Sequence, residues 1–127
     1  MKPEKKLYQK LKKNTPNILW TRLETWASFG VPDLIGYHSL CGFFMVELKI
    51  QTANKIRFSP HQVLFHTTRN YRNFILVNQS PNAPRSAIKL YSSKNIEGLI
   101  LDPREIKPLA VNDWQLIENI LINKKNN

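Results

Sequence analysis

Three charged residues interrupt an apolar stretch of the chain that reads GVPDLIGYHSLCGFFMVELKI and spans residues 30–50. They are Asp33, Glu47 and Lys49. In an extended strand residues i and i+2 share a face, so Glu47 and Lys49 point to one side and the alternating apolar residues to the other. We therefore expect one face of this strand to feed the core and the other to carry charge. A hairpin through HSLCG would bring Asp33 beside Glu47.

This trio of side chains is suited to chemistry on phosphate esters. Two neighbouring carboxylates repel each other unless a cation lies between them. Mg²⁺ prefers oxygen ligands, usually takes one or two protein carboxylates, and completes its shell with water and phosphate oxygens. Lys49 would then contact the attacking water or the scissile phosphate. The pattern predicts metal-assisted hydrolysis of a phosphodiester, and an ordinary ion pair on an edge strand is the alternative that strand patterning leaves open.

The elements that must position these residues follow from periodicity and turn chemistry. The clearest boundary is a helix start, where Ser59 is expected as N-cap, Pro60 as first helical residue and Gln62 as partner in a capping box. The order of the elements predicts an α/β fold with a mixed central sheet flanked by helices. In chain order we expect a helix at 3–13, strands at 17–24, 32–38 and 43–50, the helix after Ser59, strands at 73–79 and 86–92, an unassigned segment at 96–101, and a C-terminal helix begun by Asn112 or Asp113.

The charge balance narrows the choice of partner. The chain of 127 residues carries 19 Lys and Arg against 9 Asp and Glu, a formal net charge of +10. Such an excess favours a polyanion, with nucleic acid first and an anionic membrane surface second. No stretch approaches the roughly 20 apolar residues of a membrane span, and the single Cys41 excludes a disulfide framework. We therefore expect a soluble cytoplasmic protein of one domain, residues 1–127, with no membrane partner.

Contacts to the phosphates of DNA would come from Lys and Arg side chains, and they would be independent of base sequence and sensitive to salt. The residues predicted to make them are Lys5, Lys6, Lys10, Lys12, Lys13, Arg22, Lys55, Arg57, Arg69 and Arg72.

The longer string GVPDL…FFMVELK…FSPHQ resembles the PD-(D/E)XK nuclease superfamily. Members carry Pro and Asp at the entry to a strand and Glu-x-Lys within a following apolar strand, which Pro32, Asp33, Glu47 and Lys49 match here. The string is most similar to the virus-type replication and repair nuclease branch (VRR-NUC), with archaeal-type Holliday junction resolvases as more distant relatives. The resemblance runs from Glu4 to about residue 77.

This resemblance implies a restriction-endonuclease-like αβββαβ core at about residues 3–79, followed by an extension of strand and helix at 80–127. It implies Mg²⁺, replaceable by Mn²⁺, held by Asp33, Glu47 and the backbone carbonyl of Leu48. Lys49 would assist the nucleophilic water, and cleavage would leave a 5′-phosphate and a 3′-hydroxyl.

Three further residues compete for roles in the site. Family members often add a glutamate from the first helix, and Glu4 matches by position and by sharing a helical stripe with the apolar residues that follow it. A favourable charge at a helix N-terminus would also explain Glu4, and Glu24 competes for the same ligand position. Gln62 matches the family's glutamine on the helix after the catalytic strand, although the capping box explains it equally well. His61 and His66, five residues apart, do not share a helix face and are not expected as a metal pair or as the base.

The function these features predict is a Mg²⁺-dependent DNA endonuclease, either structure-selective or nicking, or a homodimer that gains a second active site. A phage, bacterial or repair setting would fit it. Two alternatives stay open. One is a non-catalytic nucleic-acid-binding module on the same fold, and the other is an RNA-directed nuclease, since a metal site alone does not read a 2′-hydroxyl.

Overall fold

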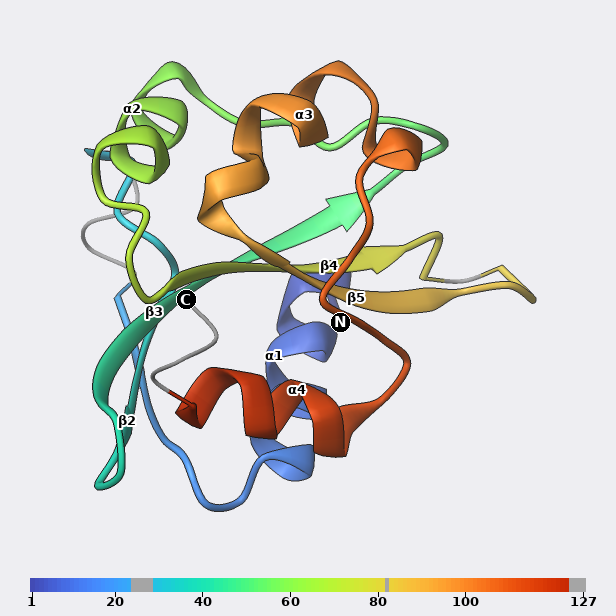
Figure 1. Cartoon of the computed structure of the whole chain (residues 1–127). Coiled ribbons are helices and arrows are strands. Elements are labelled where there is room, and N and C mark those ends of the chain that lie inside the picture. Colours follow the sequence, from blue (N-terminus) through green and yellow to red (C-terminus); the bar gives the residue numbers. More distant parts are fainter. Residues whose placement is uncertain (24–28, 82, 124–127) are drawn as a thin grey trace.

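A six-stranded sheet runs through the middle of the computed structural model, which describes residues 1–23, 29–81 and 83–123 (Figure 1). The strands lie across the sheet in chain order, and each neighbouring pair is antiparallel except β3 and β4, which are parallel. Parallel neighbours need a crossover connection, and helix α2 provides it. The described elements are α1 (Pro3–Asn14), β1 (Leu19–Arg22), β2 (Leu34–His38), β3 (Gly42–Gln51), α2 (Pro60–Thr68), β4 (Asn73–Gln79), β5 (Ala87–Ser92), the short 3₁₀ helix η2 (Ser93–Asn95), α3 (Ile96–Leu101), the short 3₁₀ helix η3 (Pro103–Glu105), β6 (Ala110–Val111) and α4 (Trp114–Ile122).

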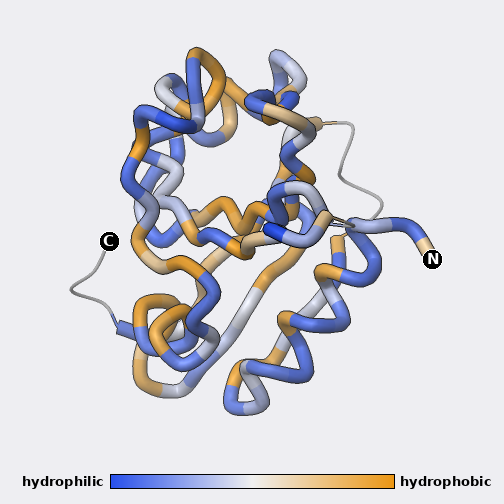
Figure 2. The backbone as a smooth tube through the Cα atoms, turned by 90° about the vertical axis from the view of Figure 1, so that its right-hand side faces the viewer, coloured by the Kyte–Doolittle hydropathy of each residue, from blue (hydrophilic) through white to orange (hydrophobic). Residues whose placement is uncertain are grey.

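The helices form a layer on each face of this sheet, with α1 and α4 on one side and α2 and α3 on the other (Figure 1). This arrangement and the leading order α1-β1-β2-β3-α2-β4 confirm the predicted fold class, a mixed sheet flanked by helices. Figure 2 shows hydrophobic segments concentrated in the strands between the layers, while α1, beside the N mark, is mostly hydrophilic with hydrophobic residues at intervals. Amphipathic helices of this kind are held in place by the face they bury.

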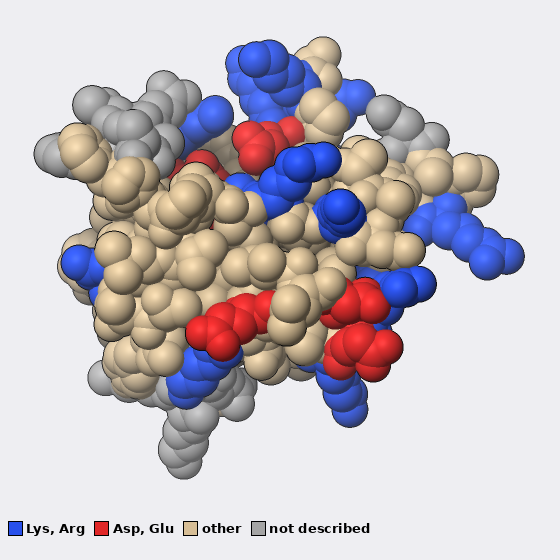
Figure 3. Space-filling model, turned by 90° about the horizontal axis from the view of Figure 1, so that it is seen from above, with Lys and Arg blue, Asp and Glu red and all other residues tan. Residues whose placement is uncertain are grey.

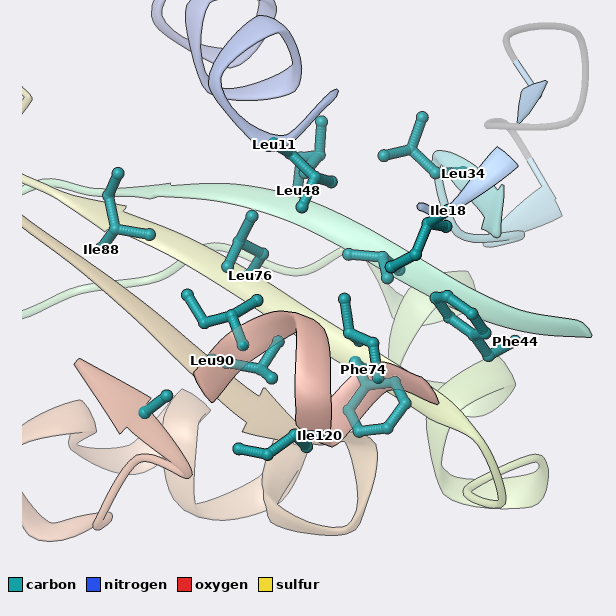
Figure 4. Packing of buried hydrophobic residues seen from close by; sticks show 14 of the residues in the cluster. Leu11, Ile18, Leu34, Phe44, Leu48, Phe74, Leu76, Ile88, Leu90 and Ile120 are labelled. Atoms are coloured by element: carbon teal, nitrogen blue, oxygen red, sulfur yellow. The ribbon is translucent and has the colours of Figure 1, made fainter. Parts of the chain in front are cut away.

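Two apolar clusters, one on each face, hold the layers together. The larger cluster lies between the sheet and the pair α1 and α4, where Leu11 approaches Leu48 and Ile120 lies near Phe74 (Figure 4). The smaller cluster lies beneath α2 and α3 and includes Ile75, at the middle of β4. Because helices cover both faces of the sheet, the side chains of β3 and β4 are buried on both sides.

The double burial affects the charged face of β3. Val46 and Leu48 face the larger cluster, as alternation predicts. The opposite face carries the charged residues, as expected, and α2 covers it, so that Glu47 is only 2% exposed while Lys49 is half-buried. The Glu47 carboxylate therefore lies inside the fold, where electrostatic interactions are stronger than at the surface.

The start of α2 is confirmed in detail. The Ser59 hydroxyl accepts a hydrogen bond from the backbone N–H of Gln62 at 3.1 Å, and the Gln62 side-chain oxygen accepts one from the backbone N–H of Ser59 at 2.9 Å. Pro60 occupies the first turn, where its missing N–H is of no consequence. The C-terminal helix also begins as expected, because the Asp113 side chain caps α4 by accepting from the N–H of Leu116.

Other boundaries differ from expectation. The first strand is shorter than residues 17–24, since β1 ends at Arg22. Asp33 stands one residue before β2, although the Leu23 N–H still bonds to the Asp33 carbonyl and extends the pairing. The unassigned segment 96–101 is the helix α3, and the two-residue strand β6 was not predicted. The described part of the chain contains no helix long and apolar enough to cross a membrane.

Candidate active site

The carboxyl groups of Asp33 and Glu47 lie side by side at the junction of β2 and β3. Strand register accounts for this, because Leu34 pairs with Val46 and so sets their two chain neighbours next to each other. Asp33 Oδ2 accepts a hydrogen bond of 2.7 Å from the backbone N–H of Leu48. The two carboxyls are also close enough to hydrogen-bond to each other when one of them is protonated. The predicted hairpin thus brings the two acids together.

Burial makes these acids unusually weak. Burial and repulsion from Glu47 raise the pKa of Asp33 to about 7. Burial likewise raises the pKa of Glu47 to about 7, although the hydrogen bond from Asp33 and the charge of Lys49 act in the opposite direction. Near neutral pH the pair therefore shares a proton, which a divalent cation could replace.

Gln62 connects this acid pair to Lys49. Its side-chain N–H donates to Glu47 Oε2 at 3.2 Å, and its oxygen accepts from Lys49 Nζ at 2.9 Å. The same oxygen accepts from Ser59, so the capping role and the site role coexist in one side chain. The Lys49 ammonium also lies 4.9 Å from the ring centroid of Phe58, within range of a cation–π interaction.

His66 completes the surroundings of Glu47, although it was not predicted to lie there. Its side chain is fully buried, and Nε2 lies 3.7 Å from Glu47 Oε1. On the other side of the ring, Nδ1 is 2.7 Å from the hydroxyl of Ser93, which is also buried. Burial and the nearby charge of Lys49 lower the pKa of His66 to about 4, so the imidazole is neutral at pH 7.

One sequence signal could have identified His66. Gln62 and His66 are four residues apart on α2, a spacing that places two side chains on one helix face. The spacing of five from His61, which is exposed and lies off that face, does not reveal this relation.

Glu4 lies at the edge of the site rather than in its centre. It was expected on a core-facing stripe, but it is exposed, one turn before the buried Leu7. It still lies close enough that Asp33 repels and Lys49 attracts its charge, and burial with that repulsion raises the pKa of Glu4. Glu24, the competing ligand, lies outside the described residues.

A cavity of about 870 Å³ lies at the edge of the site, and neither Asp33 nor Glu47 lines it. Glu4 and Lys49 line it together with Lys55 and Arg57, two of the residues predicted to contact phosphate. Lys2, which was not predicted to contact phosphate, also lines it. This is therefore the place where predicted catalytic and predicted DNA-binding residues meet.

The remaining basic residues are spread over both faces of the molecule. Seen from the side of α2 and α3, Lys and Arg side chains are scattered over the surface, several beside acidic ones, and form no continuous band among the described residues (Figure 3). Lys12 and Arg22 both lie against the ring of Tyr8, at 5.2 and 5.4 Å from its centroid, and Arg69 lies 4.6 Å from that of Phe65. Lys5, Lys6, Lys10 and Lys13 are exposed on α1, across the sheet from α2.

Arg72 requires a correction as a DNA contact. It is 6% exposed, its guanidinium lies 5.4 Å from the ring centroid of Phe44, and it donates to the backbone carbonyls of Leu121 and Asn123. It was predicted from charge alone, and charge does not reveal that the C-terminal helix covers this position. Arg72 fastens α4 to the sheet.

The carboxylate oxygens of the acid pair are suitable ligands for a hard divalent ion. Among the described residues no three Asp, Glu, His or Cys side chains gather around a point that could hold a metal. Two carboxylates nevertheless suffice for Mg²⁺ when water and phosphate supply the other ligands. Glu47 Oε1 is buried and makes no hydrogen bond within the described part of the chain, so an acceptor oxygen is available.

Comparisons with known proteins give a likeness in structure but no named family. No protein-family model matches the sequence, and no curated protein matches it either. The chain is similar in structure to Hjc, a Holliday junction resolvase from the archaeal hyperthermophile Archaeoglobus fulgidus, with a TM-score of 0.49 and 15% sequence identity over 72% of this chain and 73% of that chain. The fold and the site described above rest on this chain's own elements and contacts.

Proposed function

We propose that this protein is a divalent-metal-dependent nuclease that hydrolyses phosphodiester bonds of DNA. The observation that carries the proposal is the pair of buried, adjacent carboxyls of Asp33 and Glu47 with Lys49 held beside them. Membership of the PD-(D/E)XK superfamily, and of its virus-type branch, belongs to the same proposal and is supported by the motif. A cytoplasmic location belongs to it as well.

In this proposal Asp33, Glu47 and the Leu48 carbonyl hold Mg²⁺. The bound ion would supply a hydroxide-like water and neutralise charge on the phosphate. The chain's own contribution is the placement of charge. Gln62 fixes the Lys49 ammonium through a 2.9 Å hydrogen bond, so a cation is already in place before the phosphate arrives and need not be reorganised.

The cavity lined by Lys49 offers a path for the scissile strand. Lys55 and Arg57, which also line it, would neutralise the phosphates that flank the reacting one, and Lys49 would face the reacting phosphate itself. The role of Glu4, at the rim, would be to join the ion when DNA is bound. This arrangement favours contacts to the backbone over reading of bases, which fits a structure-selective or nicking enzyme.

Residues 3–79 would form the catalytic core and residues 80–127 would support it. Described parts of that extension complete the sheet and both helix layers, and Arg72 links α4 to the core.

A homodimer is also part of the proposal. Leu19, Tyr37 and Phe43 are paired across three neighbouring strands and exposed, and such an apolar row would suit a second copy.

The proposal is tested with the wild type, Asp33→Asn and Lys49→Met on plasmid, four-way junction, single-stranded DNA and matched RNA. We expect the wild type to cut DNA with Mg²⁺ or Mn²⁺ and not with EDTA, and each variant to lose about 100-fold or more in rate. The products should be sealed by DNA ligase without a kinase, which reports 5′-phosphate and 3′-hydroxyl ends. A purified wild type that cuts none of these substrates would contradict the proposal.

A binding module is the second candidate function, because the described residues bring only two acidic side chains directly together. It is established if all three proteins bind DNA equally and none of them cleaves. Cleavage of the RNA strand alone would instead indicate the RNA-directed nuclease.

A further inference from the structure

Helix α2 (Pro60–Thr68) presents two side chains to the same carboxylate. Gln62 donates to Oε2 of Glu47 at 3.2 Å, and Nε2 of His66 lies 3.7 Å from Oε1. One helical turn separates Gln62 from His66, so both project from one face toward β3. Each carboxylate oxygen of Glu47 thus faces a different residue of the same helix.

The contact between His66 and Glu47 joins two atoms that lack other partners. Glu47 Oε1 and His66 Nε2 are both buried and make no hydrogen bond to any described residue. Buried polar atoms are nearly always satisfied, so a pair that face each other at 3.7 Å are natural partners. A shift of under 1 Å would bring them to the usual N–H···O distance of about 2.9 Å.

Ser93 and Glu47 together decide which nitrogen of His66 donates, because the Ser93 hydroxyl can either donate to Nδ1 or accept from it. A neutral imidazole carries one N–H, and the Ser93 hydroxyl lies 2.7 Å from Nδ1. When Ser93 donates its hydroxyl proton to Nδ1, the hydrogen of the ring must be on Nε2, where it points at Glu47. The opposite tautomer would set the lone pair of Nε2 against those of a carboxylate. Only the first tautomer is compatible with an ionised Glu47.

We propose that His66, oriented by Ser93, is a positioning residue that donates from Nε2 to Glu47 Oε1 and holds this carboxylate in the orientation that receives the divalent ion. The inference rests on the proposed function, because it assigns a role in the same site. It gives residues beyond the αβββαβ core a role in that site, because Ser93 follows β5. Partners of metal ligands commonly fix ligand geometry in this way.

The first test measures Mn²⁺ affinity in the absence of DNA, by titration calorimetry or by the electron paramagnetic resonance of free Mn²⁺. His66→Phe keeps an aromatic ring but has no donor, and it should weaken Mn²⁺ binding about 10- to 100-fold. His66→Gln retains an N–H that can reach Oε1 and should recover affinity to within about threefold of wild type. Ser93→Ala should lose about three- to tenfold, because the tautomer is no longer fixed.

Leu99→Ala is the matched control. Leu99 is fully buried in the apolar cluster on the same face and has no polar group to offer to His66 or Glu47, so its truncation should lower the melting temperature and leave Mn²⁺ affinity unchanged. A folded His66→Phe with wild-type affinity would overturn the inference. So would a His66→Gln that binds Mn²⁺ no better than His66→Phe.

The second test reads the tautomer directly in the wild-type protein, and it decides the matter if His66→Phe fails to fold. Long-range ¹H–¹⁵N NMR correlations of the imidazole should show the Nε2–H tautomer, and a population dominated by Nδ1–H would overturn the inference. Wild-type Mn²⁺ binding with unaffected variants would refute this inference alone. A wild type that neither binds Mn²⁺ nor cleaves DNA would refute the proposed function and, with it, the positioning role.

Discussion

Gln62 takes part both in the local folding of α2 and in the proposed chemistry. One side-chain oxygen accepts from both Ser59 and Lys49, while the amide N–H donates to Glu47. Carbonyl oxygens have two lone pairs, so the two acceptor roles do not compete. The beginning of α2 is therefore fixed by the same contacts that place the cation of the site.

This double role predicts that Gln62→Glu separates stability from activity. A glutamate can still close the capping box, so the free energy of unfolding should stay within about 1 kcal/mol of wild type. It cannot donate to Glu47 and adds a third carboxylate beside two buried ones, so we expect cleavage to fall by about 10-fold or more. Urea denaturation and single-turnover cleavage measure the two effects.

Ser59→Ala provides the converse control. It removes a cap hydrogen bond and should cost about 1 kcal/mol of stability, yet it leaves Gln62 able to contact Glu47 and Lys49. If Ser59→Ala and Gln62→Glu had the same effect on activity at equal stability, the side-chain contacts of Gln62 would have no part in the site.

At the scale of elements, the loop before β2 packs against helix α2, and this contact sets the position of Asp33. Gly30 has φ +79°, and a Cβ at this position would come within 2.2 Å of the carbonyl oxygen of His61. Only glycine permits both that conformation and that contact. The loop is thereby pressed against the first turn of α2, three residues before Asp33.

We predict that Gly30→Ala destabilises the protein by more than about 2 kcal/mol, because it adds both backbone strain and a backbone clash. Gly42→Ala is the matched control, since Gly42 also has φ +79° but has open space where the Cβ would be. It should lose only about 1 kcal/mol, for strain alone. Chemical denaturation of both variants decides the point, and equal losses would show that the contact with α2 is unimportant.

The elements also show what the sequence could predict and what it could not. Alternation and a short hairpin were enough to pair Asp33 with Glu47, because register along two adjacent strands is a local property. The capping box of α2 joins residues only three positions apart, so it could be predicted for the same reason. The burial of His66 depends on Ser93, 27 residues away along the chain, and on the layer formed by α2 and α3. The burial of Arg72 depends in the same way on α4, which is distant in the sequence. The charge pattern therefore wrongly predicted a surface position for it.

At the scale of the whole molecule, the buried acid pair links stability to pH. The pKa of Asp33 and that of Glu47 are both raised to about 7 in the folded protein, from ordinary values of 3.8 and 4.5. Between about pH 4 and pH 7 the folded state therefore holds more protons on this pair than the unfolded state does. The stability that the pair contributes is complete below this window and is lost as the pH rises through about 7.

His66 opposes this trend, because its pKa is lowered to about 4 from 6.5. Below pH 6.5 the unfolded state binds a proton at this histidine that the folded state excludes, so this group favours folding as the pH rises. The contribution of the two acids to stability is obtained by subtracting the stability of Asp33→Asn/Glu47→Gln from that of the wild type at each pH. In this double variant His66 is retained and both acids are replaced by neutral amides.

We predict that, without divalent ions, the stability of the wild type relative to Asp33→Asn/Glu47→Gln falls as the pH rises from 5 to 8. Mg²⁺ should raise the melting temperature of the wild type more at pH 8 than at pH 5, because the ligands must lose their shared proton before they bind it. The double variant should gain nothing from Mg²⁺ at either pH. Thermal melts at the two pH values, with EDTA or Mg²⁺, provide the measurement. A wild type whose relative stability is the same at both pH values would show that folding does not raise the pKa of either acid.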